Sequence, residues 1–173
     1  YKGENADALI QLDRLAKKLR AARFKNGAVK FDREELHFDV DEKGHPLRCY
    51  FKRSKDANKL IEEFMLLANR TVAESVGKVK KGMKPKTLPY RVHDNPDPQK
   101  LETLREFVVK FGYKMKTDGT KGALARSLNT LMSACEGKRE QNLIQTVALR
   151  AMMKAKYSIH NIGHFGLAFD YYT

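Results

Sequence analysis

Cysteine is scarce in this sequence, and the two that occur, Cys49 and Cys135, lie far apart along the chain. They have neither the close spacing of a zinc site nor that of a redox motif, so we expect two buried free thiols in a reducing compartment. Long apolar runs are also missing. No stretch approaches the ~20 apolar residues of a membrane-spanning helix, and we therefore expect a cytoplasmic protein without a membrane span.

Several well-known catalytic motifs are absent as well. The chain has no glycine-rich loop followed by Lys-Ser or Lys-Thr, no nucleophile elbow and no dinucleotide-binding fingerprint. It also has no tight cluster of aspartates, which a nuclease that uses two metal ions would need. The residues alone therefore predict no catalytic centre within this chain.

What the sequence has in excess is positive charge. It contains 34 Lys and Arg against 21 Asp and Glu, which gives a formal net charge of +13. This balance favours a polyanionic partner, with nucleic acid first and an acidic membrane surface well behind. One run, residues 78–86, contains five lysines and no acid. We expect it to be an exposed loop that can contact a polyanion.

Apolar residues recur at helical spacing over most of the chain. This periodicity predicts helices at residues 6–23, 54–76, 97–111, 121–135 and 140–156. Asp97 is the expected N-cap of its helix, with Pro98 in the first turn. The first helix carries four basic residues on its other face, Lys17, Lys18, Arg20 and Arg23. They could contact phosphates, but a solvated basic face is the simpler interpretation. Because there is no internal repeat and no Ser- or Gly-rich linker, we expect residues 1–173 to form a single domain.

Residues 28–52 change to a period of two, with turn chemistry at residues 41–44 between two alternating stretches. The pattern predicts a β-hairpin with an apolar face toward the core and a polar face toward solvent. Asp39, Asp41 and Glu42 are close in sequence. The alternation places the two aspartates on the solvent face beside the turn, so we expect no metal ion there. The fold class that follows is α+β, mainly helical with one β-hairpin.

The helix expected after the hairpin is the most informative element. Ser54 is its expected N-cap and Gly77 its stop. Its apolar residues are Ile61, Phe64, Met65, Leu66, Leu67 and Ala68. They surround most of the circumference, which predicts a buried helix. Glu62 and Glu63 lie within this apolar run, and buried carboxylates are costly unless they are paired or carry out a function.

The last segment, residues 157–173, is rich in glycine and aromatic residues and too irregular for a helix. His160 and His164 lie four residues apart, but Gly163 and the missing acidic base do not fit the zinc-protease motif. We therefore expect turn and core histidines. Phe31, which precedes the hairpin strands, is either an ordinary core residue or a platform on which a base stacks. From the residues alone, the sequence predicts a basic, mainly helical module that binds nucleic acid.

Three stretches together resemble the ribonuclease II family, also called the RNB family, and within it most closely the bacterial ribonuclease R enzymes. They are ANKLIEEFMLLANRTVAE at 57–74, PYRVHDNPDPQKLETL at 89–104 and YSIHNIGHFGLAFDYYT at 157–173. Their order and approximate spacing also match, and the resemblance extends over essentially the whole chain. It implies a partial RNB catalytic domain. The parent would be a monomeric 3′–5′ exoribonuclease that hydrolyses single-stranded RNA processively, inside a narrow channel with Mg²⁺ in its active site.

The same resemblance implies that the catalytic centre lies outside this chain. The family's metal-binding aspartates would precede Tyr1, and the segment with the family's essential arginine would begin after Thr173. We therefore expect the middle of a catalytic domain, inactive alone, with no catalytic residue and no metal ligand of its own. The alternative is a non-catalytic, basic RNA-binding accessory module that is complete in itself. A membrane-surface protein is a weaker third possibility.

Two residues take roles from their positions in the family's motifs. Phe31, in the segment GAVKF, resembles the family's aromatic residue that stacks on bases at the RNA 3′ end. Glu62, the first acid in IEEFM, resembles the family's carboxylate near the ribose 2′-hydroxyl, a contact that can distinguish RNA from DNA. The alternative for Glu62 is a salt bridge to Lys59 or Arg70. For Glu63 we expect a structural role.

Overall fold

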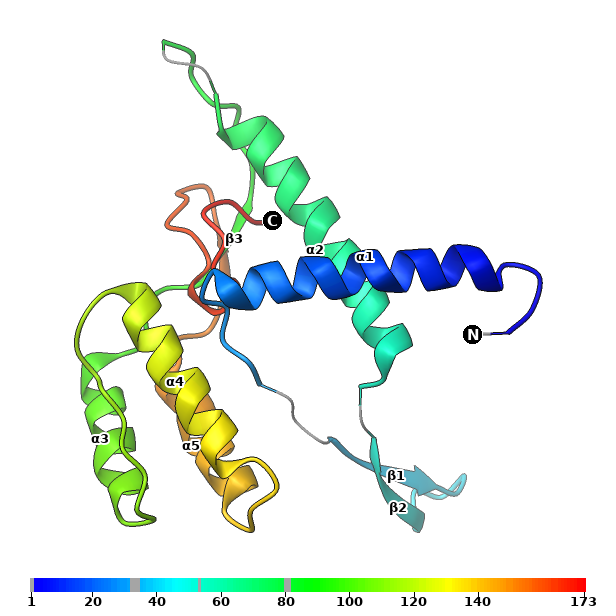
Figure 1. Ribbon diagram of the computed structural model, residues 1–173, viewed down its shortest axis with the longest axis vertical. Helices are drawn as coiled ribbons and strands as arrows, with labels where there is room; N and C mark the ends of the chain where they lie inside the picture. Colours follow the sequence, from blue (N-terminus) through cyan, green and yellow to red (C-terminus); the bar gives the residue numbers. More distant parts are fainter. Residues whose placement is uncertain (1, 32–34, 53, 80–81) are drawn as a thin grey trace.

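Two long helices cross at the centre of the molecule, in a computed structural model that describes residues 2–31, 35–52, 54–79 and 82–173 (Figure 1). They are α1 (Ala6–Lys25) and α2 (Asp56–Gly77), and a β-hairpin of β1 (Glu35–Val40) and β2 (Pro46–Lys52) lies between them in sequence. The remaining elements are β3 (Tyr90–Val92), α3 (Pro98–Val109), α4 (Lys121–Cys135), α5 (Gln141–Ala151), β4 (Lys156–Ser158) and the short 3₁₀ helix η1 (Phe165–Leu167). The predicted α+β class, mainly helical with a β-hairpin, is confirmed. Within the described residues, no helix combines the length and the apolar character needed to cross a membrane.

Capping side chains set the starts of two helices. Asp97 caps α3 as predicted, because its carboxylate accepts hydrogen bonds from two backbone N–H groups of the first turn, at 2.9 and 3.3 Å. At α2 the predicted cap, Ser54, is wrong. Lys55 holds the cap position, and its backbone N–H donates to Oδ1 of Asn58 at 3.0 Å. The helix also includes Gly77 as its last residue rather than stopping before it.

Helix α5 is shorter than the periodicity predicted. It ends at Ala151, and the chain becomes extended at Met152. Strand β4 then pairs antiparallel with β3. The segment after the helix thus leads into a strand that pairs with a distant part of the chain.

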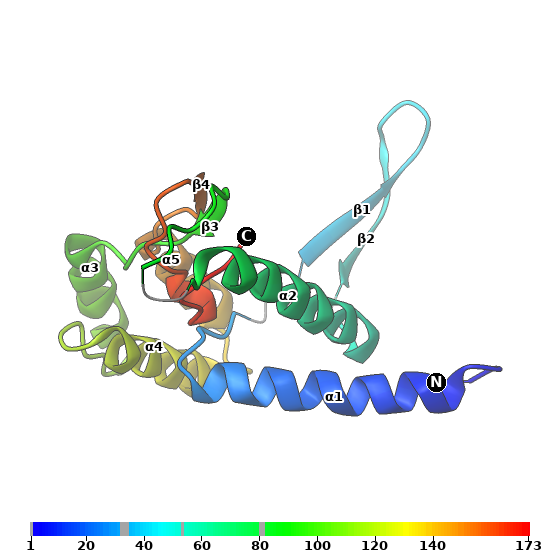
Figure 2. The ribbon, with the colours of Figure 1, turned by 90° about the horizontal axis from the view of Figure 1, so that it is seen from above.

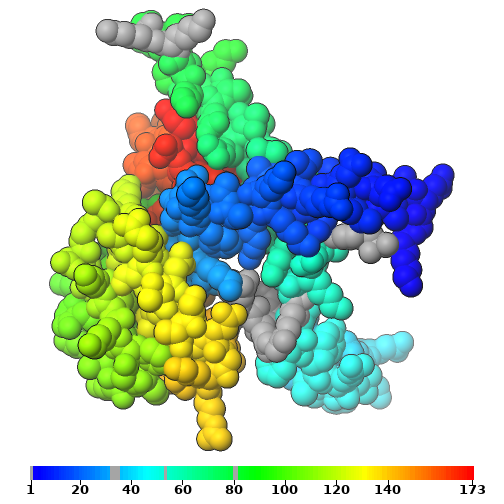
Figure 3. Space-filling model, viewed as in Figure 1, coloured from blue at the N-terminus to red at the C-terminus, as the bar shows by residue number. Residues whose placement is uncertain are grey.

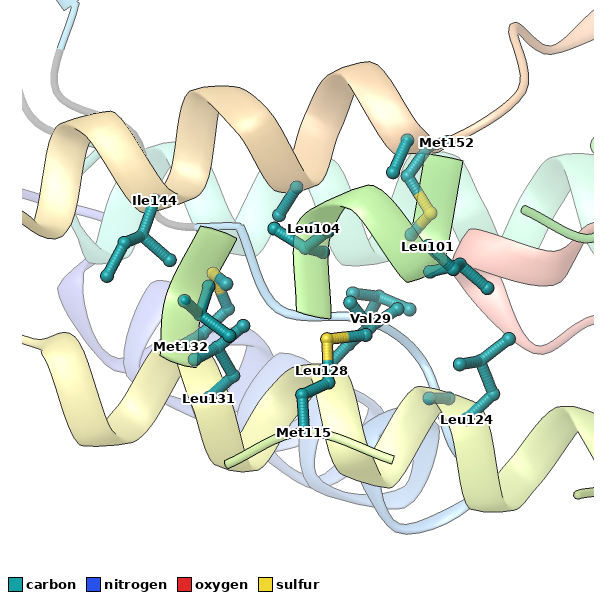
Figure 4. Close-up of a cluster of buried hydrophobic side chains, with 14 of the residues drawn as sticks. Val29, Leu101, Leu104, Met115, Leu124, Leu128, Leu131, Met132, Ile144 and Met152 are labelled. Atoms are coloured by element: carbon teal, nitrogen blue, oxygen red, sulfur yellow. The ribbon is translucent and has the colours of Figure 1, made fainter. Parts of the chain in front are cut away.

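The main hydrophobic core lies between α3, α4 and α5 (Figure 4). Its large fully buried side chains include Leu104, Val108, Leu128, Leu131 and Ile144, each at most 1% exposed. Burying one side chain of this size stabilises the folded state by about 1.5–3 kcal/mol. Val29, from the linker after α1, and Phe165, from the tail, belong to the same cluster. The core of the helical bundle therefore also anchors the two segments that run past it.

The hairpin stands apart from the helical bundle (Figures 2 and 3). Its strands are antiparallel, with Leu36 opposite Phe51. The prediction that its apolar face packs toward the core is wrong, since Phe38 is 56%, Leu47 70% and Phe51 61% exposed. A two-stranded ribbon buries a face only where another layer covers it. No described element covers this one.

Two other predictions about the hairpin region also fail. The first strand begins at Glu35 rather than near residue 28, although residues 32–34 lie outside the described part of the chain. Cys49, on β2, is exposed, so its predicted burial is wrong, whereas the predicted burial of Cys135 on α4 is confirmed. In the basic run at 78–86, residues 80 and 81 likewise lie outside the described residues.

The tail returns to the centre of the molecule, beside β3 and the second half of α2 (Figure 1, orange and red). Backbone hydrogen bonds hold it there. The N–H of Arg91 donates to the carbonyl of Tyr172 at 2.8 Å, and the N–H of His93 donates to that of Gly163 at 3.0 Å. The N–H of Phe165 donates back to the carbonyl of His93 at 2.9 Å. The segment is irregular in sequence but closely bound in the fold.

Candidate functional site

Helix α2 is amphipathic rather than buried on all sides. Leu66 is buried, but Ile61 and Met65 are 58% and 60% exposed, so the prediction of a fully buried helix is wrong. Its buried side packs against α1. Glu63 lies on that side, with a side chain only 3% exposed, whereas the side chain of Glu62 is 48% exposed. The two neighbouring acids therefore lie in different environments.

Arg23, in the last turns of α1, contacts both acids. Its Nε donates to Oε2 of Glu63 at 3.2 Å, and its Nη2 donates to the other oxygen of the same carboxylate. The same Nη2 also donates to Oε1 of Glu62, at 3.4 Å. The Arg23 side chain is only 5% exposed. Two parallel bonds between a guanidinium and a carboxylate form the strongest common type of charged hydrogen bond, which compensates for burying both groups.

Arg20, one turn earlier on α1, completes the charge cluster. Its Nη1 lies 3.5 Å from a Glu63 oxygen and 3.9 Å from a Glu62 oxygen. The guanidinium carbons of Arg20 and Arg23 lie 4.9 and 4.8 Å from the ring centre of Phe24, within the range of cation–π contacts. Two arginines and two glutamates therefore balance in charge where α1 meets α2.

Sequence reasoning missed the partners of the two acids. The structure pairs Glu62 with the arginines of α1, and Arg70, one of the two expected partners, instead binds Glu74 through Nε at 2.9 Å. Arg23 was expected on a solvated basic face, and this is wrong because the side chain is buried. The structural role expected for Glu63 agrees with its buried ion pair. The only signal in the sequence was that buried acids require a positive partner somewhere.

Two cavities flank the charge cluster. One, of about 210 Å³, lies between α1 and α2 and is lined in part by Arg20 and Glu63. The other, of about 70 Å³, is lined in part by Arg23, Asn26 and Phe169. Asn26 and Phe169 also line a third cavity, of about 200 Å³, whose walls are otherwise formed by the tail, Gly27 and the first residues of α4. The charge cluster and the tail are thus adjacent parts of one surface.

Two histidines fix the tail in this position. The rings of His93 and His164 lie 4.9 Å apart, edge to face. Nδ1 of His93 accepts from the N–H of Gly166 at 3.1 Å, and Nδ1 of His164 accepts from the N–H of Leu167 at 3.2 Å. Burial lowers the pKa of both rings. The pKa of His164 falls to about 4, with smaller contributions from His93 and Arg91. Both rings are therefore neutral at physiological pH and act as hydrogen-bond acceptors.

These contacts agree with core and turn positions for the tail histidines. His164 packs against His93, from β3, and His160 is exposed. In the part of the chain that the structure describes, no three His, Cys, Asp or Glu side chains come together in a way that could hold a metal ion. The two carboxylates of the charge cluster, Glu62 and Glu63, face guanidinium groups rather than other metal-ligating side chains.

Phe31 lies at the end of a well-anchored linker. Asn129 on α4 accepts from the backbone N–H of Lys30 and donates to the carbonyl of Ala28, both at 2.8 Å. The N–H of Val29 donates to the carbonyl of Gly166 in the tail at 2.9 Å. Phe31 is half-buried and packs against the main core. It therefore contacts the core and still leaves part of its ring accessible, and both interpretations of this residue stay open.

Phe31 and Glu62 are not next to each other in sequence, but α1 supports both. Arg23 in the last turns of this helix holds the acids of α2, and the linker that leaves the helix carries Phe31. The tail contacts this linker at Val29, and its Phe169 lines the same cavity as Arg23 and Glu63. Glu62 thus offers a hydrogen-bond acceptor and Phe31 an aromatic ring, on separate elements that α1 connects.

Comparison with known proteins identifies relatives of the whole chain. The family model for the RNB domain matches residues 2–173. Ribonuclease R of Aquifex aeolicus (strain VF5) is 37% identical over 170 residues, which is 96% of this chain and 23% of that protein. Ribonuclease R of Escherichia coli (strain K12) is 32% identical over 165 residues, 95% of this chain and 19% of that protein. The chain thus spans roughly a fifth of the length of these relatives.

Solved structures agree with the sequence comparison. Mycoplasma genitalium RNase R in complex with ribose methylated single-stranded RNA has a TM-score of 0.81 and 26% identity, and the match covers 97% of this chain and 25% of that one. Yeast Ssd1, a pseudonuclease, has a TM-score of 0.63 at 18% identity, which shows a shared fold alone. The resemblance seen in the three sequence stretches is confirmed, and this chain belongs to the RNB domain family.

Proposed function

We propose that this chain is the RNA-channel segment of a 3′–5′ exoribonuclease that hydrolyses single-stranded RNA processively. The observation that carries the proposal is that Arg23 binds the buried Glu63, while the adjacent Glu62 keeps about half of its side chain accessible. A carboxylate held in this way can accept a hydrogen bond from a ligand at the surface of α2. Relatives named Ribonuclease R, and a similar structure that holds single-stranded RNA, support RNA as that ligand.

Glu62 accepts a hydrogen bond from a ribose 2′-hydroxyl in this proposal. A carboxylate oxygen is an acceptor only, and deoxyribose has no hydroxyl to donate at this position. The contact would therefore favour RNA over DNA, as expected for a group that reads the sugar. The guanidinium groups of Arg20 and Arg23 lie 3.9 and 3.4 Å from the two oxygens of Glu62 and orient its carboxylate.

Phe31 stacks on a base near the RNA 3′ end. Stacking of a base on an aromatic ring is worth about 1–3 kcal/mol per base and is tolerant of sequence, which suits an enzyme that moves along its substrate. Phe31 is available for this role because it packs against the core without being fully buried. The net charge of +13 supplies a general attraction for the phosphate backbone.

The hydrolytic centre of this enzyme lies outside the chain. Mg²⁺, bound by residues of the parent protein, would activate the attacking water and stabilise the charge that develops on the phosphate. The residues of this chain bind and orient the RNA end and take no part in proton transfer. The parent enzyme acts as a monomer in the cytoplasm, and the chain alone does not cleave RNA.

Replacing Glu62 in the full-length protein tests the proposal. We expect Glu62→Ala to lower the preference for RNA over DNA oligonucleotides, while Glu74→Ala leaves it unchanged. Glu74 is a suitable control because it lies on the same helix and also pairs with an arginine, Arg70. An RNA preference equal to that of the wild type in Glu62→Ala would remove the proposed role of this residue.

A non-catalytic RNA-binding module is the second candidate function. The observation that favours it is that the pseudonuclease Ssd1 shares this fold, so the fold by itself does not require catalysis. Mg²⁺-dependent degradation of single-stranded RNA by the full-length protein distinguishes the two. Degradation from the 3′ end supports the enzyme, and binding of RNA without any degradation supports the module.

A further inference from the structure

We propose that Arg23 is a positioning residue for Glu62, which acts by holding Glu63 and so decides which of the two acids reaches a ribose. The inference rests on the proposed function, because it takes the ribose 2′-hydroxyl as the ligand of Glu62. Two adjacent, chemically identical side chains thereby take different roles: Glu62 contacts the ribose, and Glu63 stabilises the crossing of α1 and α2.

The first step is the bond between Arg23 and Glu63. The guanidinium uses Nε and Nη2 to bind both oxygens of the Glu63 carboxylate, and both side chains are at most 5% exposed. Arg20 adds a third contact, at 3.5 Å. Both oxygens of Glu63 thus face protein donors, and the carboxylate is out of reach of solvent. Glu63 is therefore excluded as the acid that binds a ligand.

The second step concerns the orientation of Glu62. Its Oε1 lies 3.4 Å from Nη2 of Arg23, and its Oε2 lies 3.9 Å from Nη1 of Arg20. A guanidinium therefore faces each oxygen from the α1 side. A carboxylate has about four lone-pair sites, so acceptor capacity remains on the exposed side. The arginines set the orientation of the Glu62 carboxylate. Its side chain is 48% exposed and would rotate freely without these contacts.

The geometry at position 23 requires the guanidinium of an arginine. The planar fork of Arg23 can bind both oxygens of Glu63 and still direct the same Nη2 toward Glu62. Lysine carries a single ammonium group and cannot reproduce this fixed geometry. An Arg23→Lys substitution keeps the positive charge beside Glu63 and removes the fork. It therefore separates the orientation of Glu62 from the charge balance of the cluster.

The test uses the full-length enzyme and two RNA substrates. One is an all-ribose oligonucleotide, and the other carries a single 2′-deoxyribose at a defined position near the 3′ end, scanned over the last few nucleotides. The ratio of kcat/KM for the two substrates measures how strongly the 2′-hydroxyl is read. The variants are Glu62→Ala, Arg23→Lys, the two combined, and the control Arg105→Lys, whose arginine pairs with Glu102 on α3.

We expect Glu62→Ala to lower the ratio about tenfold, the typical effect of one hydrogen bond to a charged group. Arg23→Lys should lower it by a similar factor, and the combined variant should fall no further, because the two residues act as a unit. Arg105→Lys should keep the wild-type ratio. If Arg23 were merely structural, Arg23→Lys would slow both substrates equally, and that unchanged ratio would overturn the inference.

The failure of the inference is distinguishable from the failure of the proposed function. A wild-type ratio in Arg23→Lys together with a lowered ratio in Glu62→Ala rejects the positioning role of Arg23 and retains that of Glu62. A wild-type ratio in Glu62→Ala rejects both. If Arg23→Lys does not fold, the combined Arg23→Gln and Glu63→Gln variant removes both buried charges together. A lowered ratio in that variant supports the inference, and a wild-type ratio overturns it.

Discussion

Arg23 on α1 binds the carboxylate of Glu63 on α2 through two nitrogens, although the two residues are 40 positions apart in the sequence. This pair ties together the two long helices at their crossing point. It also separates Glu63 from Glu62, which points to the edge of the same junction. The contact that joins the two helices therefore lies directly beside an acid whose side chain stays 48% exposed.

Removal of Glu63 should be strongly destabilising. Glu63→Ala leaves the buried guanidinium of Arg23 without its bidentate partner and with a longer contact to Glu62, and breaking a buried ion pair in this way costs about 3–5 kcal/mol. Glu74→Ala breaks an exposed ion pair with Arg70 on the same helix and should cost less than about 1 kcal/mol. Urea denaturation measures the free energy of unfolding of both variants. Equal effects of the two substitutions would mean that the buried pair has no special weight.

One side chain, that of Asn129, makes two hydrogen bonds to the linker that carries Phe31. Asn129→Ala removes two hydrogen bonds of 2.8 Å to the backbone of Ala28 and Lys30, which should lower the free energy of unfolding by about 1–3 kcal/mol. The exposed Asn95 provides the control, and Asn95→Ala should change the stability by less than about 0.5 kcal/mol. If Phe31 stacks on RNA, Asn129→Ala should also weaken RNA binding by the full-length protein. A variant with wild-type stability would show that the linker is held by other contacts.

Gly163 meets two requirements at once in the tail. Its φ is +80°, and a Cβ added there would lie 3.2 Å from the carbonyl oxygen of Phe169. Gly44, in the hairpin turn, has a similar φ of +84° with nothing near its Cβ position. Gly44→Ala should therefore cost about 1 kcal/mol for backbone strain alone, and Gly163→Ala about 2 kcal/mol or more. Thermal unfolding of the two variants compares them, and a smaller loss for Gly163→Ala would contradict the close packing of the tail.

Stability should fall as the pH is lowered from neutral. The pKa of His164 is lowered to about 4 in the folded state, below the value of about 6.5 expected for the unfolded chain. Between these values the unfolded state binds a proton that the folded state does not, so unfolding is favoured progressively below about pH 6.5. The ring is partly accessible, so we expect a loss of about 2 kcal/mol by pH 4.

Two variants check this pH dependence. His164→Asn keeps an acceptor for the backbone and removes the titrating group, so the loss between pH 6.5 and 4 should become smaller. His160→Gln alters an exposed histidine and should leave the pH profile unchanged. The measurement is the unfolding midpoint in urea at a series of pH values. The same profile in wild type and His164→Asn would exclude this ring as the source.

Features set by local sequence were predictable, and those set by distant pairing were not. Periodicity and capping gave the helices and the cap at Asp97, because each depends on residues within a few positions of one another. The apolar alternation of the hairpin was real, but alternation does not say whether a second layer covers the face. The pairing of β4 with β3 joins segments far apart in the chain, which no local pattern reveals.

In the candidate site, too, some residues could be proposed from local sequence and others depend on contacts between distant elements. Glu62 and Phe31 could be proposed from the sequence, because their motifs resemble those of a known family, and their roles stay predictions. Arg23 was not, because a basic residue on an amphipathic helix ordinarily faces solvent. Its role appears only when α1 and α2 cross and bring it to Glu63. The sequence could predict that the acid needs a partner, but the crossing geometry selects which one.

A crystal structure of the full-length protein with single-stranded RNA bound is the most direct test of the central claim. We predict a ribose 2′-oxygen within about 3.2 Å of the Glu62 carboxylate, with Arg23 still bound to Glu63 and the Phe31 ring against a base. An RNA strand whose riboses all lie beyond hydrogen-bonding distance of Glu62 would contradict the account.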